Sequence, residues 1–343
     1  MKQLFEPISL HHFTSKNRLV RSATWEGIAN PDGSVTDTAY KIYEELAKGG
    51  VGTIITGFTS VSLNDYYFDG MMRLSNDSLI EQYKKLVNII HAEHTPVLTQ
   101  LALGAYYRRI NRRFVQVEPD DMTADEIHQV IRQFIQAAVR AEKAGFDGVQ
   151  IHAAHYFFLS RFISPAVNHR TDAYGGSVEN RSRILVEILE GIRKKTEHLH
   201  ISMKINSNDF SFNGLEEDQC LEICQILDQK GIDSIEISGN GTSVAGIRAH
   251  VNEGYFVDAA AQVAQAVSCP VMVVGGFRSQ DVIEAVLNRT KIEMISLSRP
   301  LLREPDLPNR WKEDPSRVSQ CISCNRCYSS TCHRCVFRKK AAV

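Results

Sequence analysis

An alternation of short apolar runs with longer amphipathic ones is the feature that most constrains this chain. Eight runs are short, rich in β-branched residues and often bounded by Gly or Pro, which is typical of buried parallel strands. They are Arg18–Ala23, Val51–Thr56, Pro96–Leu101, Gly148–His152, Ile201–Ile205, Ser234–Ser238, Pro270–Val274 and Met294–Ser298. Eight strand–helix units predict a single-domain α/β fold, the (β/α)8 TIM barrel, in preference to an open doubly wound sheet.

The segments between these runs carry helical periodicity. Apolar residues recur at helical spacing over Ile80–Ile90 and over Ile127–Ala138. Thr123 and Glu126 are spaced to form a capping box at the start of the second of these helices. The acidic residues Glu216, Glu217 and Asp218 occupy the first turn of a third predicted helix, where they complement the positive end of the helix dipole.

Composition and charge exclude several classes of protein. The chain has 39 Lys and Arg residues against 40 Asp and Glu, so its net charge of −1 gives no case for a nucleic-acid partner. No apolar run approaches the ~20 residues that a membrane span needs, and the first residues do not form a signal peptide. We therefore expect a cytoplasmic protein with small-molecule partners and no membrane partner. The sequence leaves open whether the chain forms a homo-oligomer.

The cysteines mark a second region at the end of the chain. Five of the eight cysteines crowd into 15 residues, at Cys321, Cys324, Cys327, Cys332 and Cys335. From Arg317 onward there are six Lys or Arg residues and no Asp or Glu. We expect the barrel to occupy residues 1–314 and a basic Cys-rich tail to occupy residues 315–343. In a cytosolic chain such crowding indicates metal binding more readily than disulfides, although a solvated end is an alternative for the tail.

A TIM barrel carries its active site at the C-terminal ends of its strands. In this chain those ends are polar, charged or glycine: Thr56, Gly57, Gln100, His152, His155, Lys204, Asn206, Ser238, Gly239, Gly275, Gly276, Ser298 and Arg299. The last two strands lead into Gly275-Gly276 and Ser298-Arg299, and the loops after strands seven and eight recurrently bind phosphate in barrels. Glycines let backbone N–H groups approach a phosphate, and Arg299 supplies a charged donor. A tight turn beside a surface arginine is the alternative to this predicted phosphate site.

Three other strand-end residues leave their chemistry open. His152 and His155 could bind a metal, could donate hydrogen bonds to a carbonyl or a negatively charged oxygen, or could be structural histidines. Lys204 requires an anionic partner if it is buried, and a lysine with a depressed pKa could form a Schiff base. A colourless barrel aldolase or metal hydrolase that uses these residues is therefore an alternative function. A non-enzymatic barrel that carries a metal-dependent binding tail is another.

Several motifs resemble the old yellow enzyme family of FMN-dependent oxidoreductases, also described as NADH:flavin oxidoreductases. They are Leu4-Phe5-Glu6-Pro7-Ile8, Lys16-Asn17-Arg18-Leu19-Val20, Ile151–His155, Ser164-Pro165, Asn168–Asp172, Tyr174–Ser177 and Glu179-Asn180-Arg181. The resemblance extends from Leu4 to about Pro305 and includes most of the barrel. It implies an enzyme that passes hydride from NAD(P)H through FMN to an electron-poor acceptor. An α,β-unsaturated carbonyl, a quinone or a flavin is the acceptor that the resemblance suggests.

The resemblance also assigns positions around the flavin ring. It places Ala23 and Thr24 against the ring and Gln100 at the pyrimidine edge. Lys204 stands where the family has a basic residue near flavin N1 and O2, and a fixed cation there would stabilise the anionic reduced flavin. Together with the phosphate residues, the expected cofactor contacts are Ala23, Thr24, Gly57, Gln100, Lys204, Ser238, Gly239, Gly275, Gly276, Phe277, Ser298 and Arg299.

The catalytic residues that the resemblance implies are His152, His155 and a proton donor. The two histidines would bind the acceptor oxygen and polarise the conjugated double bond for hydride attack. The proton donor of the family is a tyrosine two residues after the second histidine, and here that residue is Phe157, which cannot donate a proton. Tyr156, the neighbouring residue, is the candidate donor; the alternatives are solvent and an acceptor that needs no such donor.

The Cys-rich tail resembles the start of a cluster segment in larger members similar to 2,4-dienoyl-CoA reductase. The matching stretch is Cys321-Ile322-Ser323-Cys324-Asn325. The spacing of the later cysteines differs from that of the larger members. A [4Fe–4S] cluster, a zinc ion and metal-free thiols therefore all remain possible for the tail.

Overall fold

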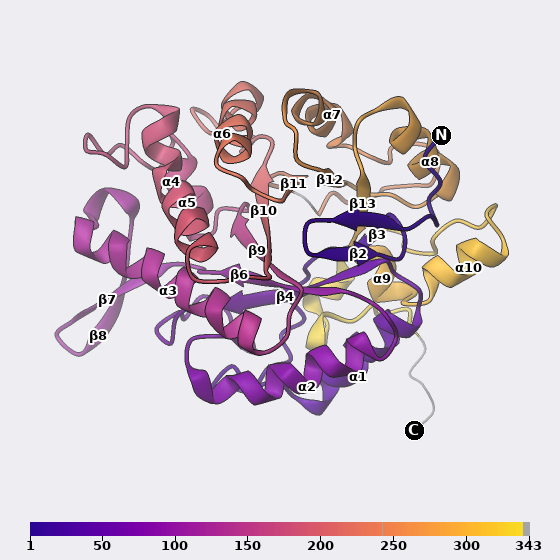
Figure 1. The fold of residues 1–343 in the computed structure, drawn as a ribbon, viewed down its shortest axis with the longest axis horizontal. Coiled ribbons are helices and arrows are strands. Elements are labelled where there is room, and N and C mark those ends of the chain that lie inside the picture. The colour runs from indigo at the N-terminus through magenta and orange to yellow at the C-terminus, as the bar shows by residue number, and fades with distance from the viewer. Residues whose placement is uncertain (242, 339–343) are drawn as a thin grey trace.

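A closed barrel of parallel strands forms the centre of the protein in a computed structural model that describes residues 1–241 and 243–338 (Figure 1). Its strands are β3 (Leu19–Arg21), β4 (Thr53–Ser60), β6 (Val97–Ala102), β9 (Gly148–Ala153), β10 (His200–Asn206), β11 (Ser234–Ser238), β12 (Val271–Val274) and β13 (Met294–Leu297). Neighbours in this order pair in parallel, and β13 pairs with β3 to close the ring. The short strand β5 (Met72–Arg73) pairs in parallel with the C-terminal end of β4. All eight predicted strands and the predicted TIM barrel are confirmed.

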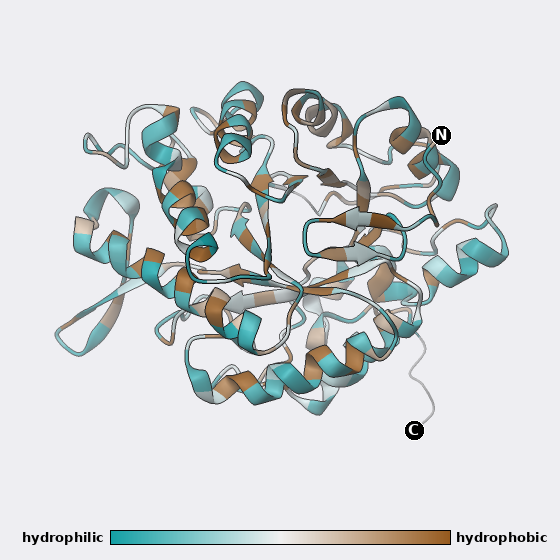
Figure 2. Cartoon of the chain, viewed as in Figure 1, coloured by the Kyte–Doolittle hydropathy of each residue, from teal (hydrophilic) through white to brown (hydrophobic). Residues whose placement is uncertain are grey.

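Helices surround the barrel and cover the outer side of its strands (Figure 1). They are α1 (Asp37–Lys48), α2 (Ile80–His91), α3 (Ala124–Lys143), α4 (Phe158–Ile163), α5 (Val178–Arg193), α6 (Glu217–Gln229), α7 (Val257–Ala266), α8 (Gln280–Arg289), α9 (Arg299–Arg303) and α10 (Leu307–Glu313). The outer helices have separate hydrophilic and hydrophobic faces (Figure 2). In α3 the predicted apolar face is buried, including Ile127, Val130 and Phe134. Burial of such faces against the strands is the main stabilising contribution of each helix.

Two hairpins were not predicted. β1 (Ile8–Leu10) and β2 (Phe13–Ser15) form one of them. It packs against the N-terminal ends of the barrel strands, near Val20 and Met294. β7 (Tyr106–Ile110) and β8 (Arg113–Val117) form the other, which projects from the loop after β6 (Figure 1). The β7–β8 turn uses Asn111 and Arg112 at φ of 47° and 66°. A two-residue turn with left-handed φ is usually marked by glycine, and the absence of glycine hid this hairpin.

The first tail residues pack against the barrel. Val318 pairs with Ser279 in an isolated antiparallel bridge, and the Ser319 amide donates to the Arg278 carbonyl at 2.8 Å. The Trp311 indole, which is fully buried, donates to the Arg317 carbonyl at 3.0 Å. In the part of the chain that the structure describes, no helix is both long and apolar enough to cross a membrane.

The capping box of α3 is formed as predicted and gives a direct test of local helix stability. The Glu126 amide donates to the Thr123 hydroxyl at 3.3 Å, and the Thr123 amide donates to the Glu126 carboxylate at 2.8 Å. We expect Thr123→Ala to lower the free energy of unfolding by about 1 kcal/mol, because it leaves an N-terminal amide of the helix without its side-chain acceptor. Urea denaturation measures this change. Thr123→Ser is the matched control, and equal stability of the two variants would contradict the assignment.

Candidate active site

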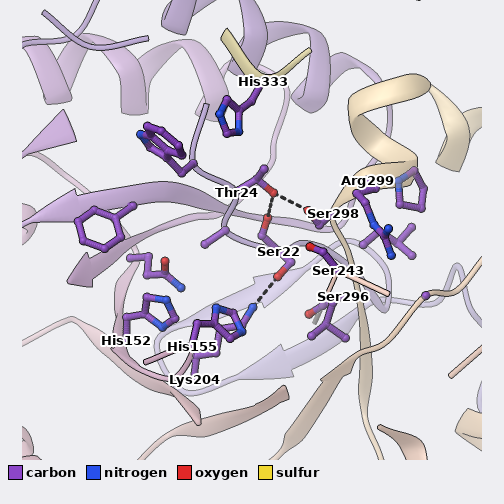
Figure 3. Close-up of a pocket in the computed structure, with 18 of the residues that line it drawn as sticks. Ser22, Thr24, His152, His155, Lys204, Ser243, Ser296, Ser298, Arg299 and His333 are labelled. Atoms are coloured by element: carbon purple, nitrogen blue, oxygen red, sulfur yellow. Dashed lines mark hydrogen bonds between the residues drawn. The ribbon is translucent and has the colours of Figure 1, made fainter. Parts of the chain in front are cut away.

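A cavity of about 190 Å³ lies at the C-terminal ends of the barrel strands. Ten of the residues predicted for the site line it: Ala23, Thr24, Gln100, His152, His155, Lys204, Gly276, Phe277, Ser298 and Arg299. Figure 3 shows His152, His155 and Lys204 together on one side of the cavity and Arg299 on another. Gly57, Ser238, Gly239, Gly275 and Tyr156 lie outside the lining. Among these, Ser238 is joined to the site through a hydrogen bond between its hydroxyl and His155 Nε2 at 2.8 Å.

Lys204 is buried, and Glu236 supplies the anionic partner that a buried ammonium requires. The Lys204 Nζ lies 3.1 Å from the Glu236 carboxylate and donates to the Ser22 hydroxyl at 2.8 Å. The two residues are paired in register across β10 and β11, so their side chains extend to the same side of the sheet. Burial raises the pKa of the Glu236 carboxyl, but the adjacent ammonium and two hydrogen-bond donors outweigh burial and lower that pKa below its ordinary value. The pair is therefore an ion pair inside the barrel.

His152 and His155 form a pair of neutral imidazoles. His152 is the penultimate residue of β9, and His155 follows in a turn where His155 and Tyr156 have left-handed φ values of 63° and 60°. Burial lowers the pKa of His152 well below its usual value, and the neighbouring His155 ring and the Lys204 ammonium add to the cost of protonating it. Burial and Lys204 lower the pKa of His155 to about 3. Each ring therefore carries one N–H at neutral pH and can donate one hydrogen bond.

Phe157, and not Tyr156, faces the cavity. The Phe157 ring centroid lies 5.0 Å from that of His152. The Tyr156 hydroxyl instead forms a hydrogen bond of 2.8 Å with the Ser211 hydroxyl at the exposed surface. After the left-handed turn, the Tyr156 side chain lies at the surface, and the apolar Phe157 ring is the one that faces the two histidines.

Two buried arginines line the cavity at the ends of β12 and β13. The Arg299 guanidinium donates to the Val244 carbonyl at 2.8 Å and to the Asn325 side chain at 2.6 Å. Arg278, a residue that the sequence did not single out as a contact, donates to the Ser323 hydroxyl at 2.6 Å. Gly276, two residues before Arg278, has a φ of 81°, and a Cβ there would lie 2.6 Å from the Tyr255 ring. Only glycine therefore fits at this point of the loop.

The tail contributes residues to the site that sequence spacing could not reveal. Tyr328 and His333 line the cavity, and Figure 3 shows His333 at its upper edge. The His333 ring centroid lies 4.3 Å from that of Trp25. Asn325 joins the tail to the barrel, because its amide also donates to the Ser243 carbonyl at 2.6 Å. Aromatic side chains from Phe58, Phe68 and Trp25 complete one wall of the cavity.

The tail cysteines lie in two places. Cys321, Cys324, Cys327 and Cys335 line a small cavity beside Arg299, whereas Cys332 lies in another with Arg21. Among the residues that the structure describes, no three His, Cys, Asp or Glu side chains are placed to hold a metal ion. As placed, the cysteines do not fit a cluster or a zinc ion. The tail metal therefore stays a prediction, and no step of the chemistry is assigned to it.

The cavity has the donors and acceptors that FMN needs. Three buried polar atoms at its lining, Trp25 Nε1, His152 Nδ1 and Ser296 Oγ, have no hydrogen-bond partner among the described residues. Orphaned buried polar atoms are costly, and a polar ligand would satisfy them. Lys204 at one end and Arg299 at the other provide positive charge for an electron-rich ring and for a phosphate. The residues present therefore fit a planar polar ring system that carries a phosphate tail.

The comparison with known families agrees with this geometry. The NADH:flavin oxidoreductase / NADH oxidase family matches residues 3–316. The chain belongs to this family. The predicted family is confirmed, and membership in a flavin oxidoreductase family supports the prediction of FMN as the cofactor.

Individual relatives are similar over nearly the whole chain. A metal reductase from Desulforamulus reducens is 29 % identical over 358 residues, which cover 99 % of this chain and 52 % of the relative. An NADPH dehydrogenase from Bacillus subtilis is 29 % identical over 315 residues, which cover 89 % and 92 %. The structure of 2-naphthoyl-CoA reductase with 2-naphthoyl-CoA superposes with a TM-score of 0.86 at 25 % identity, covering 94 % of this chain and 54 % of that one. The chain thus spans about half the length of some relatives.

The phosphate assignment predicts a specific loss of FMN affinity. We expect Arg299→Ala to weaken FMN binding by about 1.5–3 kcal/mol, the range for a hydrogen bond to a charged group. Titration of apoprotein with FMN, followed by flavin fluorescence, measures the dissociation constant. Arg303→Ala is the matched control, because Arg303 lies on the same helix α9 outside the cavity lining. Equal affinity of the Arg299→Ala and Arg303→Ala variants would show that the phosphate lies elsewhere.

Proposed function

We propose that this protein transfers hydride from NAD(P)H, through FMN, to an electron-poor small molecule in the cavity at the mouth of the barrel. The observation that carries the proposal is the convergence of two neutral histidines with Lys204 and Arg299 on one cavity. FMN, when bound, supplies the hydride-accepting and hydride-donating chemistry that the side chains lack. The eight cysteines are free thiols, which supports the further proposal that the enzyme works in the reducing cytoplasm.

Each group of residues has a proposed task toward the cofactor. Gln100 and Lys204 bind the pyrimidine edge, and Ala23 and Thr24 lie against the ring. The phosphate is bound by Gly276, Phe277, Ser298 and Arg299. The remaining predicted contacts, Gly57, Ser238, Gly239 and Gly275, flank this lining and are proposed as its backbone support. Ser238 has the clearest supporting task, since it orients His155.

His152 and His155 are proposed to hold the oxygen of the acceptor. A neutral imidazole can donate one N–H, and the two rings lie 5.0 Å apart at an angle of 82°. Two such donors aimed at one carbonyl oxygen stabilise the negative charge that develops there as hydride arrives at the conjugated carbon. The Ser238 contact fixes the His155 ring, and the His155 amide donates to the Asn206 side chain at 3.0 Å, which holds the turn.

The same contacts weigh against the colourless alternatives. An aldolase needs a neutral lysine amine, but the Lys204 ammonium is held by Glu236 in a buried ion pair. A metal hydrolase needs a third ligand, and within the described residues His152 and His155 have no His, Cys, Asp or Glu placed to complete a metal site. An FMN oxidoreductase, in contrast, uses a charged Lys204 and two histidines that bind no metal.

The geometry favours acceptors that need no proton from a tyrosine. Phe157 occupies the position of the expected donor, and the Tyr156 hydroxyl is bound to Ser211 outside the cavity. Phe68 stacks on Trp25 with ring centroids 4.2 Å apart, and both rings line the cavity. This aromatic wall suits a flat conjugated acceptor such as a quinone or a flavin. An alkene would take its proton from solvent.

The histidine assignment separates the two halves of the catalytic cycle. We expect His152→Ala with His155→Ala to slow reoxidation by 2-cyclohexenone about 10²-fold, as removal of oxyanion donors does, and to leave reduction by NAD(P)H largely intact. Anaerobic stopped-flow absorbance measures each half-reaction alone. His198→Ala is the control, since His198 is exposed at the other end of the barrel. An equal slowing of both half-reactions would contradict the assignment.

The proton-donor assignment predicts opposite results for two neighbouring residues. We expect Tyr156→Phe to leave the reduction of both an alkene and a quinone nearly unchanged, because its hydroxyl lies outside the cavity. Phe157→Tyr places a phenol beside His152, and we expect it to raise alkene reduction about 10²-fold, the lower end for general acid catalysis. Steady-state rates with 2-cyclohexenone and a naphthoquinone measure these effects. A selective loss of alkene reduction in Tyr156→Phe would assign the donor to Tyr156 instead.

A further inference from the structure

The two side chains proposed for the pyrimidine edge of the cofactor are joined through one buried carboxylate. Glu236 on β11 has no exposed surface. One of its oxygens accepts hydrogen bonds from Lys204 at 3.1 Å and from Ser22 at 2.9 Å. The other accepts from the Gln150 amide at 2.8 Å, and the Gln150 carbonyl accepts from the Gln100 amide at 2.9 Å. Glu236 is thus the branch point of a chain that ends at Lys204 on one side and Gln100 on the other.

The direction of every hydrogen bond in this chain follows from the charge of Glu236. An ionised carboxylate can only accept, so Gln150 must turn its NH₂ toward it. The Gln150 carbonyl then faces Gln100, which must donate a hydrogen bond to it through its own NH₂. The Gln100 carbonyl oxygen is left for the cavity, where no described donor contacts it. An isoalloxazine ring carries an imide N–H at its pyrimidine edge, and this oxygen is the acceptor that suits it.

The charge of Lys204 depends on the same carboxylate. Lys204 is only 3 % exposed, and an ammonium buried without a counter-ion tends to lose its proton. Among the residues that the structure describes, the other titratable groups that face Lys204 are His152 and His155, and both are neutral because burial lowers their pKa values. Glu236 is therefore the anion that keeps the ammonium charged.

We propose that Glu236 is a positioning residue of the active site, which holds Lys204 protonated and turns the Gln100 carbonyl toward the cofactor without touching the cofactor. The inference rests on the proposed function, because it concerns FMN bound in this cavity. Its consequence is that the buried ion pair presents a fixed positive charge to the pyrimidine edge of the cofactor.

The test is the pH dependence of the FMN midpoint potential in the holoprotein, measured by spectroelectrochemistry between about pH 6 and 9. In Glu236→Gln the ammonium loses its counter-ion, so over part of this range it is neutral beside oxidised FMN and takes up a proton on reduction. We expect the potential to fall more steeply with pH, because reduction by two electrons then takes up as much as one extra proton. A Glu236→Gln profile parallel to that of the wild type would overturn the proposal.

Two controls separate this effect from a general loss of structure. Glu26→Gln removes another fully buried carboxylate, but its partner Arg21 keeps its charge, so the wild-type profile is expected. Lys204→Met combined with Glu236→Gln removes the titrating amine, and its profile is expected to regain the wild-type slope. A steep slope that persists in the double variant would assign the proton to His152 or His155 and overturn the proposal.

Two further variants complete the test. Gln150→Leu breaks only the branch to Gln100, and we expect it to weaken FMN binding about tenfold while the slope stays that of the wild type. If Glu236→Gln does not fold, Ser22→Ala removes the hydroxyl that bridges Lys204 and Glu236, and a smaller steepening is expected. An unchanged profile in Ser22→Ala would then count against the proposal. Failure of the wild-type protein to bind FMN would instead refute the proposed function.

Discussion

The buried ion pair between Lys204 and Glu236 is the interaction on which the arrangement of the site depends. Two charges inside a barrel are costly unless each has a partner and further hydrogen bonds, and here the pair has both, through Ser22 and Gln150. Such a pair adds little to stability compared with apolar residues of the same size. Its value lies in the fixed positive charge and fixed hydrogen-bond directions that it presents to the cavity.

The closed barrel makes this arrangement possible. Parallel strands in register place His152, Lys204 and Glu236 side by side on β9, β10 and β11, although 84 residues separate the first from the last in sequence number. The loops after β12 and β13 add the two arginines at the other end of the cavity. The tail then covers this end, because Arg278 and Arg299 both donate to tail residues. The proposed phosphate binding and the packing of the tail therefore share the Arg299 guanidinium.

Much of the fold could be predicted from the sequence, because buried parallel strands and amphipathic helices have different periodicities. The β7–β8 hairpin was missed because its turn contains Asn111 and Arg112 in place of glycine. Glu236 and Gln150 were missed because each lies between two apolar residues in the middle of a short strand, and only the pairing of strands shows that they meet Lys204 and Gln100. Tyr328 and His333 were missed because nothing in a Cys-rich segment indicates which of its rings folds back over the barrel. The roles of the predicted site residues remain proposals, although ten of them line one cavity.

The central claim is that this chain is an FMN enzyme reduced by NAD(P)H, and the absorption spectrum of the purified protein tests it most directly. Under anaerobic conditions the account predicts oxidised-flavin bands in the visible blue, which bleach when NADH or NADPH is added and return when a quinone is added. A protein that stays colourless after incubation with FMN would contradict the account. Flavin bands that neither nucleotide bleaches would contradict the proposed reductant.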